Sequence, residues 1–395
     1  MMNANKPIIY MDNNATTAIA PEVLEAMLPY LQEYYGNPSS MYDFATHSSS
    51  AMKKARGQVA ALIGATPEEI VFTSCGTESD STAIFSALRR YPEKNHIVTT
   101  RVEHPAVKNL CDNIENLTGR KYHITHLQVS ADGTLDMQQY KDSLTDDTAI
   151  VSVMWANNET GVLFPVEEMA RIANERGILF HTDAVQAVGK IPINLKETAI
   201  DYLALSGHKL HAPKGIGVLY VRKGTPYMPF LSGGHQEQGR RGGTENVASI
   251  VALGRACELA VANMQEENTR VRALRDKLEN GLLASIPKAL LNGHKTMRLP
   301  NTANISFEYV EGEAILLHLN QHHICASSGS ACTSGSLEPS HVLRAMGVPF
   351  TAAHGSIRFS LSPYNTEAEV DTVLEVLPKI IANLRNLSPF WEENS

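Results

Sequence analysis

The chain has 395 residues, of which 43% are hydrophobic and 19% charged, and its formal net charge is −8. Its length favours two domains, and its acidic balance argues against a nucleic-acid or anionic-membrane surface. The five cysteines form no CxxC pair or zinc-ligand spacing, which predicts free thiols in a reducing compartment. Because the sequence shows no signal-peptide pattern and no apolar stretch of membrane-spanning length, we expect a cytoplasmic protein.

The first 65 residues predict two helices. Tyr10 to Thr17 runs from a strand end into a polar turn, and Pro21 then opens a helix at its first turn. The sequence Gly36-Asn-Pro-Ser-Ser40 interrupts this helix. A second helix is expected over about 48–63, ending at Gly64.

From residue 70 onward, short apolar runs alternate with longer amphipathic segments. This alternation predicts an α/β fold in which a large, mainly parallel seven-stranded sheet carries helices on both faces. Ligands of such sheets bind at the carboxyl ends of the strands. The expected strands are 70–73, 97–100, 124–127, 150–154, 178–181, 202–205 and 216–221, and the expected helices are 78–90, 105–117, 137–144 and 166–176.

A second, smaller α+β domain is expected beyond the long helical region 245–283. Its expected strands are 303–307 and 355–361, and its expected helices are 313–321, 339–346 and 366–384. We expect the large domain to cover residues 16–262, and the small domain to combine residues 1–15 with 263–395.

Lys209 is the residue best suited to covalent chemistry. It follows the apolar run 202–205, directly after Ser206, Gly207 and His208. Partial burial would lower the pKa of its amine, and the neutral amine is the form that attacks a carbonyl. A lysine after a strand can also simply point into water, so this interpretation depends on its neighbours.

Two other strand ends carry groups that would suit the same ligand. Ser74-Cys-Gly-Thr77 precedes a helix, and free N–H groups with a glycine for close approach suit a phosphate, although a plain helix N-cap has the same pattern. Asp183 lies just past the expected apolar strand 178–181, where an unpaired carboxylate is costly. Its partner could be a protonated pyridine nitrogen or a structural ion pair.

These groups together match one cofactor. Pyridoxal phosphate requires a lysine for its aldehyde, a carboxylate for its ring nitrogen and a phosphate cup. Lys209, Asp183 and the segment Gly76-Thr77 with Ser206 and His208 supply all three. His104, after the strand 97–100, could stack on a ring or move protons, or be an ordinary loop histidine.

The smaller domain contributes two more candidates. Cys332 lies in a run of ten small residues, 327–336, which predicts a mobile loop; its thiol is either reactive or incidental. Arg358, between apolar strand neighbours, could hold an α-carboxylate bidentately or pair with a glutamate at a sheet edge. Cys111, Cys257 and Cys325 are expected to be core residues.

The ordered motifs of this chain resemble those of the cysteine desulfurases across nearly its whole length. Those around Cys75, Met154 and Gly234 resemble the nitrogenase-associated NifS branch most. The family usually has a histidine and a glycine where this chain has Tyr42 and Ala45. The matching motifs are Tyr10-Met-Asp-Asn-Asn-Ala-Thr-Thr17, Gly36-Asn-Pro-Ser-Ser40, Thr73-Ser-Cys-Gly-Thr-Glu-Ser79, Glu103-His-Pro105, Asn157-Asn-Glu-Thr-Gly161, Asp183-Ala-Val-Gln186, Ser206-Gly-His-Lys209, Arg241-Gly-Gly-Thr-Glu-Asn246 and Ser328-Gly-Ser-Ala-Cys332.

The resemblance implies a homodimeric fold-type I pyridoxal-phosphate enzyme that converts L-cysteine to L-alanine. It implies that Cys332 receives the sulfur as a persulfide and passes it to an iron–sulfur scaffold protein in nitrogen fixation. It also makes the Cys332 thiol a candidate transient iron ligand shared with that scaffold. The resemblance implies that Lys209 binds the aldehyde and later moves protons, and that His104 stacks on the ring and assists proton transfer. The other cofactor contacts implied are Asp183 at the ring nitrogen, Gln186 at the ring oxygen, Gly76, Thr77, Ser206 and His208 at the phosphate, Thr244 from the second subunit, and Asn158. The substrate contacts implied are Asn13, Asn158 and Arg358.

Three alternatives remain at this point. A selenocysteine lyase or an aminotransferase of the same fold would share Lys209 and Asp183, but neither needs a thiol on a mobile loop. A non-catalytic cluster-assembly scaffold could keep the fold alone.

Overall fold

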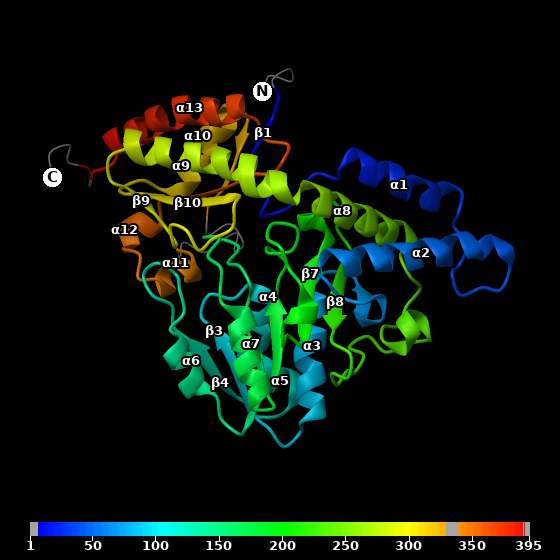
Figure 1. Ribbon diagram of the computed structural model, residues 1–395. Helices are drawn as coiled ribbons and strands as arrows, with labels where there is room; N and C mark the ends of the chain where they lie inside the picture. Colours follow the sequence, from blue (N-terminus) through cyan, green and yellow to red (C-terminus); the bar gives the residue numbers. More distant parts are fainter. Residues whose placement is uncertain (1–6, 329–338, 390, 392–395) are drawn as a thin grey trace.

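The computed structural model describes residues 7–328, 339–389 and 391. Its larger part is built around a seven-stranded sheet (Figure 1). The strands are β2 (Ile70–Thr73), β3 (His96–Thr100), β4 (His123–Leu127), β5 (Thr148–Ser152), β6 (Leu179–Asp183), β7 (Tyr202–Ser206) and β8 (Gly217–Val221). Their order in the sheet is β2-β8-β7-β6-β5-β3-β4.

Only one strand of this sheet runs against the others. β8 is antiparallel to both β2 and β7, and the pairs from β7 through β6, β5 and β3 to β4 are all parallel. The expected mainly parallel sheet is therefore confirmed. Because β2 also runs with β7, five strands that precede site motifs end at the same edge.

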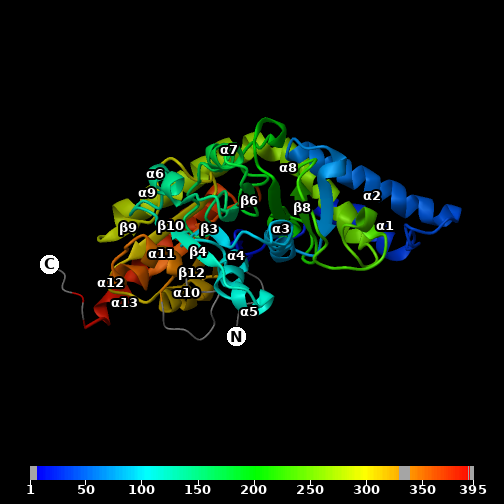
Figure 2. The ribbon, with the colours of Figure 1, turned by 90° about the horizontal axis from the view of Figure 1, so that it is seen from below.

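Helices cover both faces of the sheet (Figure 2). Strand residues alternate between two apolar cores: Ile70 and Phe72 belong to one, and Val71 belongs to the other. This double burial explains why the strands are continuous apolar runs. The helices of this part are α1 (Pro21–Gln32), α2 (Asp43–Leu62), α3 (Gly76–Arg90), α4 (Pro105–Asp112), α5 (Ile114–Thr118), α6 (Met137–Ser143), α7 (Val166–Glu175) and α8 (Val247–Glu266).

Two helices differ from the prediction by more than two residues at an end or by a break. α2 begins at Asp43 instead of residue 48. Ser48 is fully buried, and its Oγ donates to the carbonyl oxygen of Tyr34 at 3.0 Å. These tertiary contacts overcome the low helix propensity of the serines. The expected helix 105–117 is divided into α4 and α5 at Asn113, whose φ and ψ are −109° and 7°. The Asn113 side chain donates to the carbonyl oxygen of Asn109 at 2.9 Å, a local bond that competes with the helix.

Most of the remaining elements form a second, mostly antiparallel unit, but Val342, Leu343 and Ala353 belong to an apolar core of the larger part. A four-stranded sheet has the order β12-β13-β10-β9, and β1 pairs in parallel with β11. Its own apolar core includes Met11 from the N-terminal segment beside Phe307 and Phe359. The elements are β1 (Ile9–Tyr10), α9 (Arg272–Ser285), β9 (Ala289–Leu291), β10 (Thr302–Phe307), α10 (Gly312–Gln321), β11 (Ile324–Cys325), β12 (Ser327–Ser328), α11 (His341–Ala345), α12 (Phe350–Ala353), β13 (Ser356–Ser360) and α13 (Glu367–Asn386).

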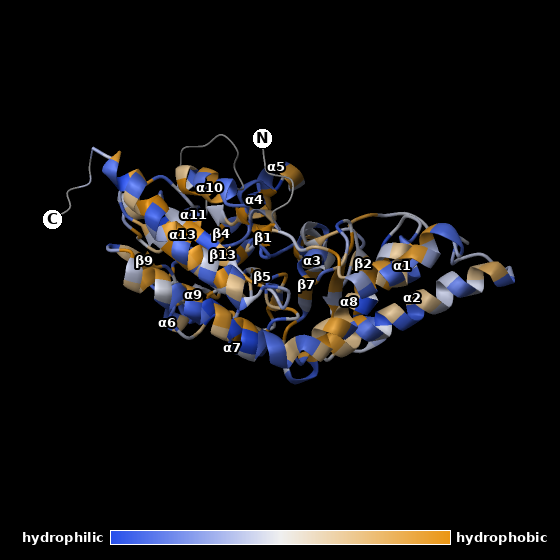
Figure 3. Cartoon of the chain, turned by 90° about the horizontal axis from the view of Figure 1, so that it is seen from above, coloured by the Kyte–Doolittle hydropathy of each residue, from blue (hydrophilic) through white to orange (hydrophobic). Residues whose placement is uncertain are grey.

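One continuous helical stretch connects the two units. α8 packs along α1 and α2, a π-helical turn at Glu267–Val271 follows, and α9 packs against α13 (Figure 3). In contrast to our expectation, Val247–Ser285 is long and apolar enough to cross a membrane, judged by length and composition alone. Half of its most apolar window is buried inside the structure, as in a core helix, so this is weak evidence for a membrane span.

The described cysteines are all free, as expected. Cys111 and Cys257 are buried. The expectation for Cys325 was wrong: it is only half-buried, and it lies in the short strand β11, which among the described residues pairs with β1 alone.

Candidate active site

A cavity of about 470 Å³ lies at the carboxyl ends of the parallel strands, and many of the residues that line it have polar side chains. Segments after β2, β3, β5, β6 and β7 line one side, and the N-terminal segment with β12 and β13 lines the other. Of the residues predicted from the sequence, the cavity brings together Gly76, Thr77, His104, Asn158, Asp183, Gln186, Ser206, His208, Lys209 and Arg358.

Lys209 is held by the N-terminal segment. It ends a 3₁₀ turn, Gly207–Lys209, directly after β7, and its Nζ donates to the carbonyl oxygens of Asn14 and Ala15, each at 2.6 Å. Burial lowers the pKa of its amine to about 8, and the positive charge of Arg358 acts in the same direction. A substantial neutral fraction therefore exists near physiological pH, as a Schiff-base amine requires.

Asp183 and Gln186 line the cavity wall, and the described residues do not use all of their hydrogen-bonding capacity. Asp183 is 5% exposed, and its Oδ1 accepts the Val185 N–H at 2.9 Å. Burial raises its pKa, against the opposing effect of His104 and Lys209. Gln186 donates from Nε2 to the carbonyl oxygen of Asn14 at 2.9 Å, whereas its buried Oε1 has no partner among the described residues. This wall is suited to a ligand that brings a cation or hydrogen-bond donor.

The amino end of α3 forms a cup. A Cβ on Gly76 would lie 2.8 Å from Val185 Cγ2 and 3.7 Å from Ser206 Cβ, so only glycine leaves the helix N-terminus open here. His208 flanks the cup, with Nδ1 3.1 Å from the hydroxyl of Thr16. Free N–H groups, hydroxyls and the helix dipole together favour a phosphate.

His104 is the N-cap residue of α4 and lines the same cavity. Its Nδ1 accepts the Ala106 N–H at 3.1 Å, and burial lowers its pKa. A neutral imidazole that accepts at Nδ1 carries its proton on Nε2, which leaves that atom able to donate.

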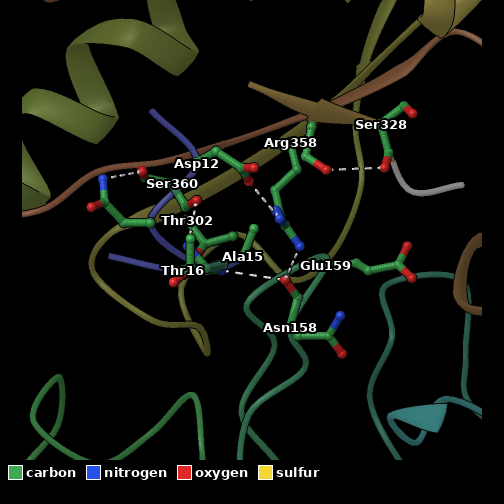
Figure 4. Close-up of polar contacts among 12 residues, drawn as sticks. Asp12, Ala15, Thr16, Asn158, Glu159, Thr302, Ser328, Arg358 and Ser360 are labelled. Atoms are coloured by element: carbon green, nitrogen blue, oxygen red, sulfur yellow. Dashed lines mark hydrogen bonds and ion pairs between the residues drawn. The ribbon is translucent and has the colours of Figure 1, made fainter. Parts of the chain in front are cut away.

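Arg358 comes from β13 and reaches between two chain segments (Figure 4). Its Nη2 donates to Asp12 Oδ1 at 2.7 Å, and its Nη1 donates to the carbonyl oxygen of Asn158 at 3.0 Å. Its partner is thus an aspartate, whereas the alternative drawn from the sequence was a glutamate.

Two predicted residues are not brought into this cavity. Thr244 is exposed and lines a different pocket, and the Asn13 amide donates to the carbonyl oxygen of Ser360 at 2.9 Å. Cys332 lies outside the described residues. Of the two departures from the family pattern, Tyr42 is 54% exposed before α2, and Ala45 is buried within that helix.

Sequence reasoning missed three acidic residues that line the cavity: Asp12, Asp80 and Glu159. Burial raises the pKa of Glu159 to about 7, and its Oε2 accepts the Ser340 hydroxyl at 2.5 Å. Asp12 and Glu159 belong to two of the matching motifs, but no local pattern marked them as site residues.

Comparison with known proteins shows the family to which the chain belongs. A family described as aminotransferase class-V matches residues 9–373. The cysteine desulfurase NifS of Azotobacter vinelandii is 61% identical over 387 residues, which are 98% of this chain and 96% of that protein. The chain belongs to the cysteine desulfurases.

Solved structures agree with this membership. A structure named NifS-like protein has a TM-score of 0.89 and 38% identity, covering 96% of this chain and all of its own. SspA in complex with cysteine has a TM-score of 0.79 and 35% identity, covering 91% of this chain and all of its own. The fold class and the assignment as an enzyme are thus confirmed.

Cysteine desulfurases depend on pyridoxal phosphate, and the donor set of this cavity fits that group. The open α3 terminus suits the phosphate, the buried Asp183 suits a cationic ring nitrogen, and Lys209 suits the aldehyde. Among the described residues, no group of three or more histidine, cysteine or acidic side chains could hold a metal ion.

Proposed function

We propose that this cysteine desulfurase binds pyridoxal phosphate at Lys209, takes the sulfur from L-cysteine as a persulfide on Cys332 and releases L-alanine. The observation that carries the proposal is the meeting of Lys209, Asp183 and the α3 terminus in one cavity with Arg358. Bound there, the cofactor would withdraw electrons from the substrate carbon, so that the carbon–sulfur bond can break.

The residues of the chain would bind, orient and move protons. Asp183 would hold the ring nitrogen protonated, while Gln186 would face the ring oxygen and His104 the ring itself. Ser206 and His208 would add to the phosphate contacts of Gly76 and Thr77. Lys209, whose amine pKa is lowered to about 8, would move protons at the substrate carbon.

Substrate orientation would rest on Arg358 and Asn158, which contact each other at the cavity edge. A guanidinium can hold a carboxylate by two parallel hydrogen bonds. Asn13 would act more distantly, since its amide is already bound to Ser360.

Sulfur transfer needs an ionised thiol. The Cys332 thiolate would attack the substrate sulfur, so that a sulfur–sulfur bond forms as the carbon–sulfur bond breaks. The electron pair stays with the carbon, which then takes a proton to give alanine. The described residues that flank the loop support this role, because Ser328 lines the cavity and Ser340 bonds to Glu159.

We also propose the partners, location and domain division expected from the sequence. Sulfur would pass to an iron–sulfur scaffold for nitrogenase in the cytoplasm, with Cys332 as a transient iron ligand. Exposed apolar side chains such as Leu31, Tyr35 and Met41 support a homodimer, in which Thr244 would complete the site of the other subunit. The separate core that contains Met11 supports a large domain of residues 16–262 and a small domain of 1–15 with 263–395.

Mass spectrometry after addition of L-cysteine tests the proposal. We expect L-alanine in solution and one extra sulfur atom on the Cys332 peptide. Cys332→Ala should keep the bound cofactor and lose both products, whereas the control Cys325→Ala should keep them. Unchanged alanine formation by Cys332→Ala would instead favour a lyase or aminotransferase, and a protein without bound aldehyde would favour a scaffold.

A further inference from the structure

The guanidinium of Arg358 is partly occupied by the protein itself. Asp12 accepts from Nη2 at 2.7 Å and the Asn158 carbonyl oxygen accepts from Nη1, but Nε has no hydrogen-bond partner among the described residues (Figure 4). Arg358 is only 7% exposed and lines the cavity. A buried donor without a partner is costly, so the Nε edge is prepared for an acceptor that enters from the cavity.

The charge balance at this edge is unusual for a carboxylate site. Asp12 and Arg358 form an ion pair whose side chains are 19% and 9% exposed, so together they present no net charge. Other charged or titratable groups on the cavity wall include Lys209, the acids Asp80, Glu159 and Asp183, and the imidazoles of His104 and His208. A carboxylate that enters the cavity would meet a net positive charge at Arg358 only if the Asp12 carboxylate moved away from the guanidinium.

The backbone fixes Asp12 in this position. Residue 12 forms a β-bridge to Ser360, two residues after Arg358 on β13, and the Asp12 carbonyl oxygen accepts the Tyr10 hydroxyl at 3.2 Å. The backbone of Asp12 is therefore a fixed part of the cavity wall. Its carboxylate can move away from Arg358 only by rotation of the side chain. The adjacent carbonyl oxygens of Asn14 and Ala15 hold Lys209, so the same short segment serves both ends of the site.

We propose that Asp12 is an internal competitor for Arg358. The Asp12 carboxylate accepts from Nη2 of the guanidinium until the α-carboxylate of a ligand binds to Nε and Nη2 and displaces it. Asp12 thereby sets how strongly the site prefers amino acids over amines that lack a carboxylate. This inference rests on the proposed function in one respect, the use of Arg358 as the carboxylate site.

Three small ligands separate the contributions. L-alanine carries both groups, ethylamine is the same molecule without the carboxylate, and propionate lacks the amine. Calorimetry on the holoenzyme should show that Asp12→Asn tightens L-alanine and propionate about fivefold and leaves ethylamine unchanged, as expected for removal of a partly exposed ion pair worth up to about 1 kcal/mol.

Two variants serve as controls. Asp112→Asn removes the same charge from an exposed pair with Lys108 and should change none of the three affinities. Asp12→Glu restores the counter-ion and should return the wild-type preference. Weaker or unchanged binding of L-alanine and propionate by Asp12→Asn would overturn the proposal, because it would make Asp12 an anchor or a bystander.

A second measurement covers the case in which Asp12→Asn fails to fold. A crystal structure of wild-type holoenzyme with L-alanine should show Asp12 Oδ1 separated from Arg358 Nη2. Persistence of the 2.7 Å bond beside the bound ligand would overturn the exchange. Formation of alanine from L-cysteine by the same preparation reports on the proposed function separately.

Discussion

The Nζ atom of Lys209 lies 2.6 Å from the carbonyl oxygen of Asn14, although 195 residues separate them in the sequence. The same oxygen accepts from Gln186 Nε2 at 2.9 Å. One backbone carbonyl near the N-terminus therefore orients two residues of the proposed cofactor site. It can do so because β1 anchors the N-terminal segment to the smaller unit, next to the edge of the large sheet.

The low pKa of Lys209 has a measurable consequence in the apoenzyme. Burial is the main cause of the shift to about 8, and the charges of Arg358 and Lys190 add to it. A lowered pKa leaves the amine neutral at lower pH, so the rate of cofactor binding should rise with pH with a midpoint near 8 instead of the ordinary value of about 10.4. Lys190→Met should move the midpoint upward, whereas Lys379→Met, on the exposed face of α13, should not. A midpoint near 10 in the wild-type protein would contradict the predicted role of burial.

Glu159 should make stability depend on pH. Its pKa is raised to about 7 by burial, so between its unfolded value near 4.5 and pH 7 the folded protein binds more protons than the unfolded chain. Stability from this group is therefore present at acid pH and is lost as pH rises through 7. Glu159→Gln should raise the free energy of unfolding by about 1 to 3 kcal/mol at pH 8 and by much less at pH 5. Denaturant titrations at both pH values test this, and a loss of stability at pH 8 would show that the ionised carboxylate is stabilised in the fold.

Gly76 should be required for phosphate binding more than for folding. A Cβ at this position would lie 2.8 Å from Val185 Cγ2 at the mouth of the cup. Gly76→Ala should weaken cofactor binding about tenfold or more, because the phosphate could no longer approach the α3 terminus closely. In contrast, Gly57→Ala lies in α2 with open space around it and should stabilise the protein by up to about 1 kcal/mol. Equal cofactor affinity for Gly76→Ala and wild type would argue against the cup.

Arg298 and Glu279 form a buried ion pair between α9 and the segment before β10. The side chains of Arg298 and Glu279 are 3% and 7% exposed, and two hydrogen bonds of 2.6 Å join them. Arg298→Met should cost about 3 kcal/mol because it leaves a buried carboxylate unpaired, and adding Glu279→Leu should recover most of that loss. The exposed pair of Arg171 and Glu175 provides the control, since Arg171→Met should change stability by less than about 0.5 kcal/mol. Thermal melts of the three variants and the wild-type protein distinguish these outcomes.

Sequence reasoning predicted the site residues that follow strands. Lys209, Asp183 and Gly76 each come at the end of an apolar run, and a parallel sheet brings such ends to one edge, so local pattern implies spatial proximity. The three-residue strand β9 was not predicted, and of the two-residue strand β1 only the end at Tyr10 was predicted. So few residues show no periodicity that could indicate a strand.

The sequence by itself determined the mainly parallel sheet, the order of its motifs and the membership in the cysteine desulfurases, since each depends on local periodicity or on contiguous motifs. Only the tertiary structure decided that Asp12 pairs with Arg358 across 346 residues, that Glu159 is buried beside Ser340, and that Asn13 and Thr244 lie outside the cavity. The physical reason is that ion-pair partners and burial are selected by packing between distant segments. No local pattern of residues encodes them.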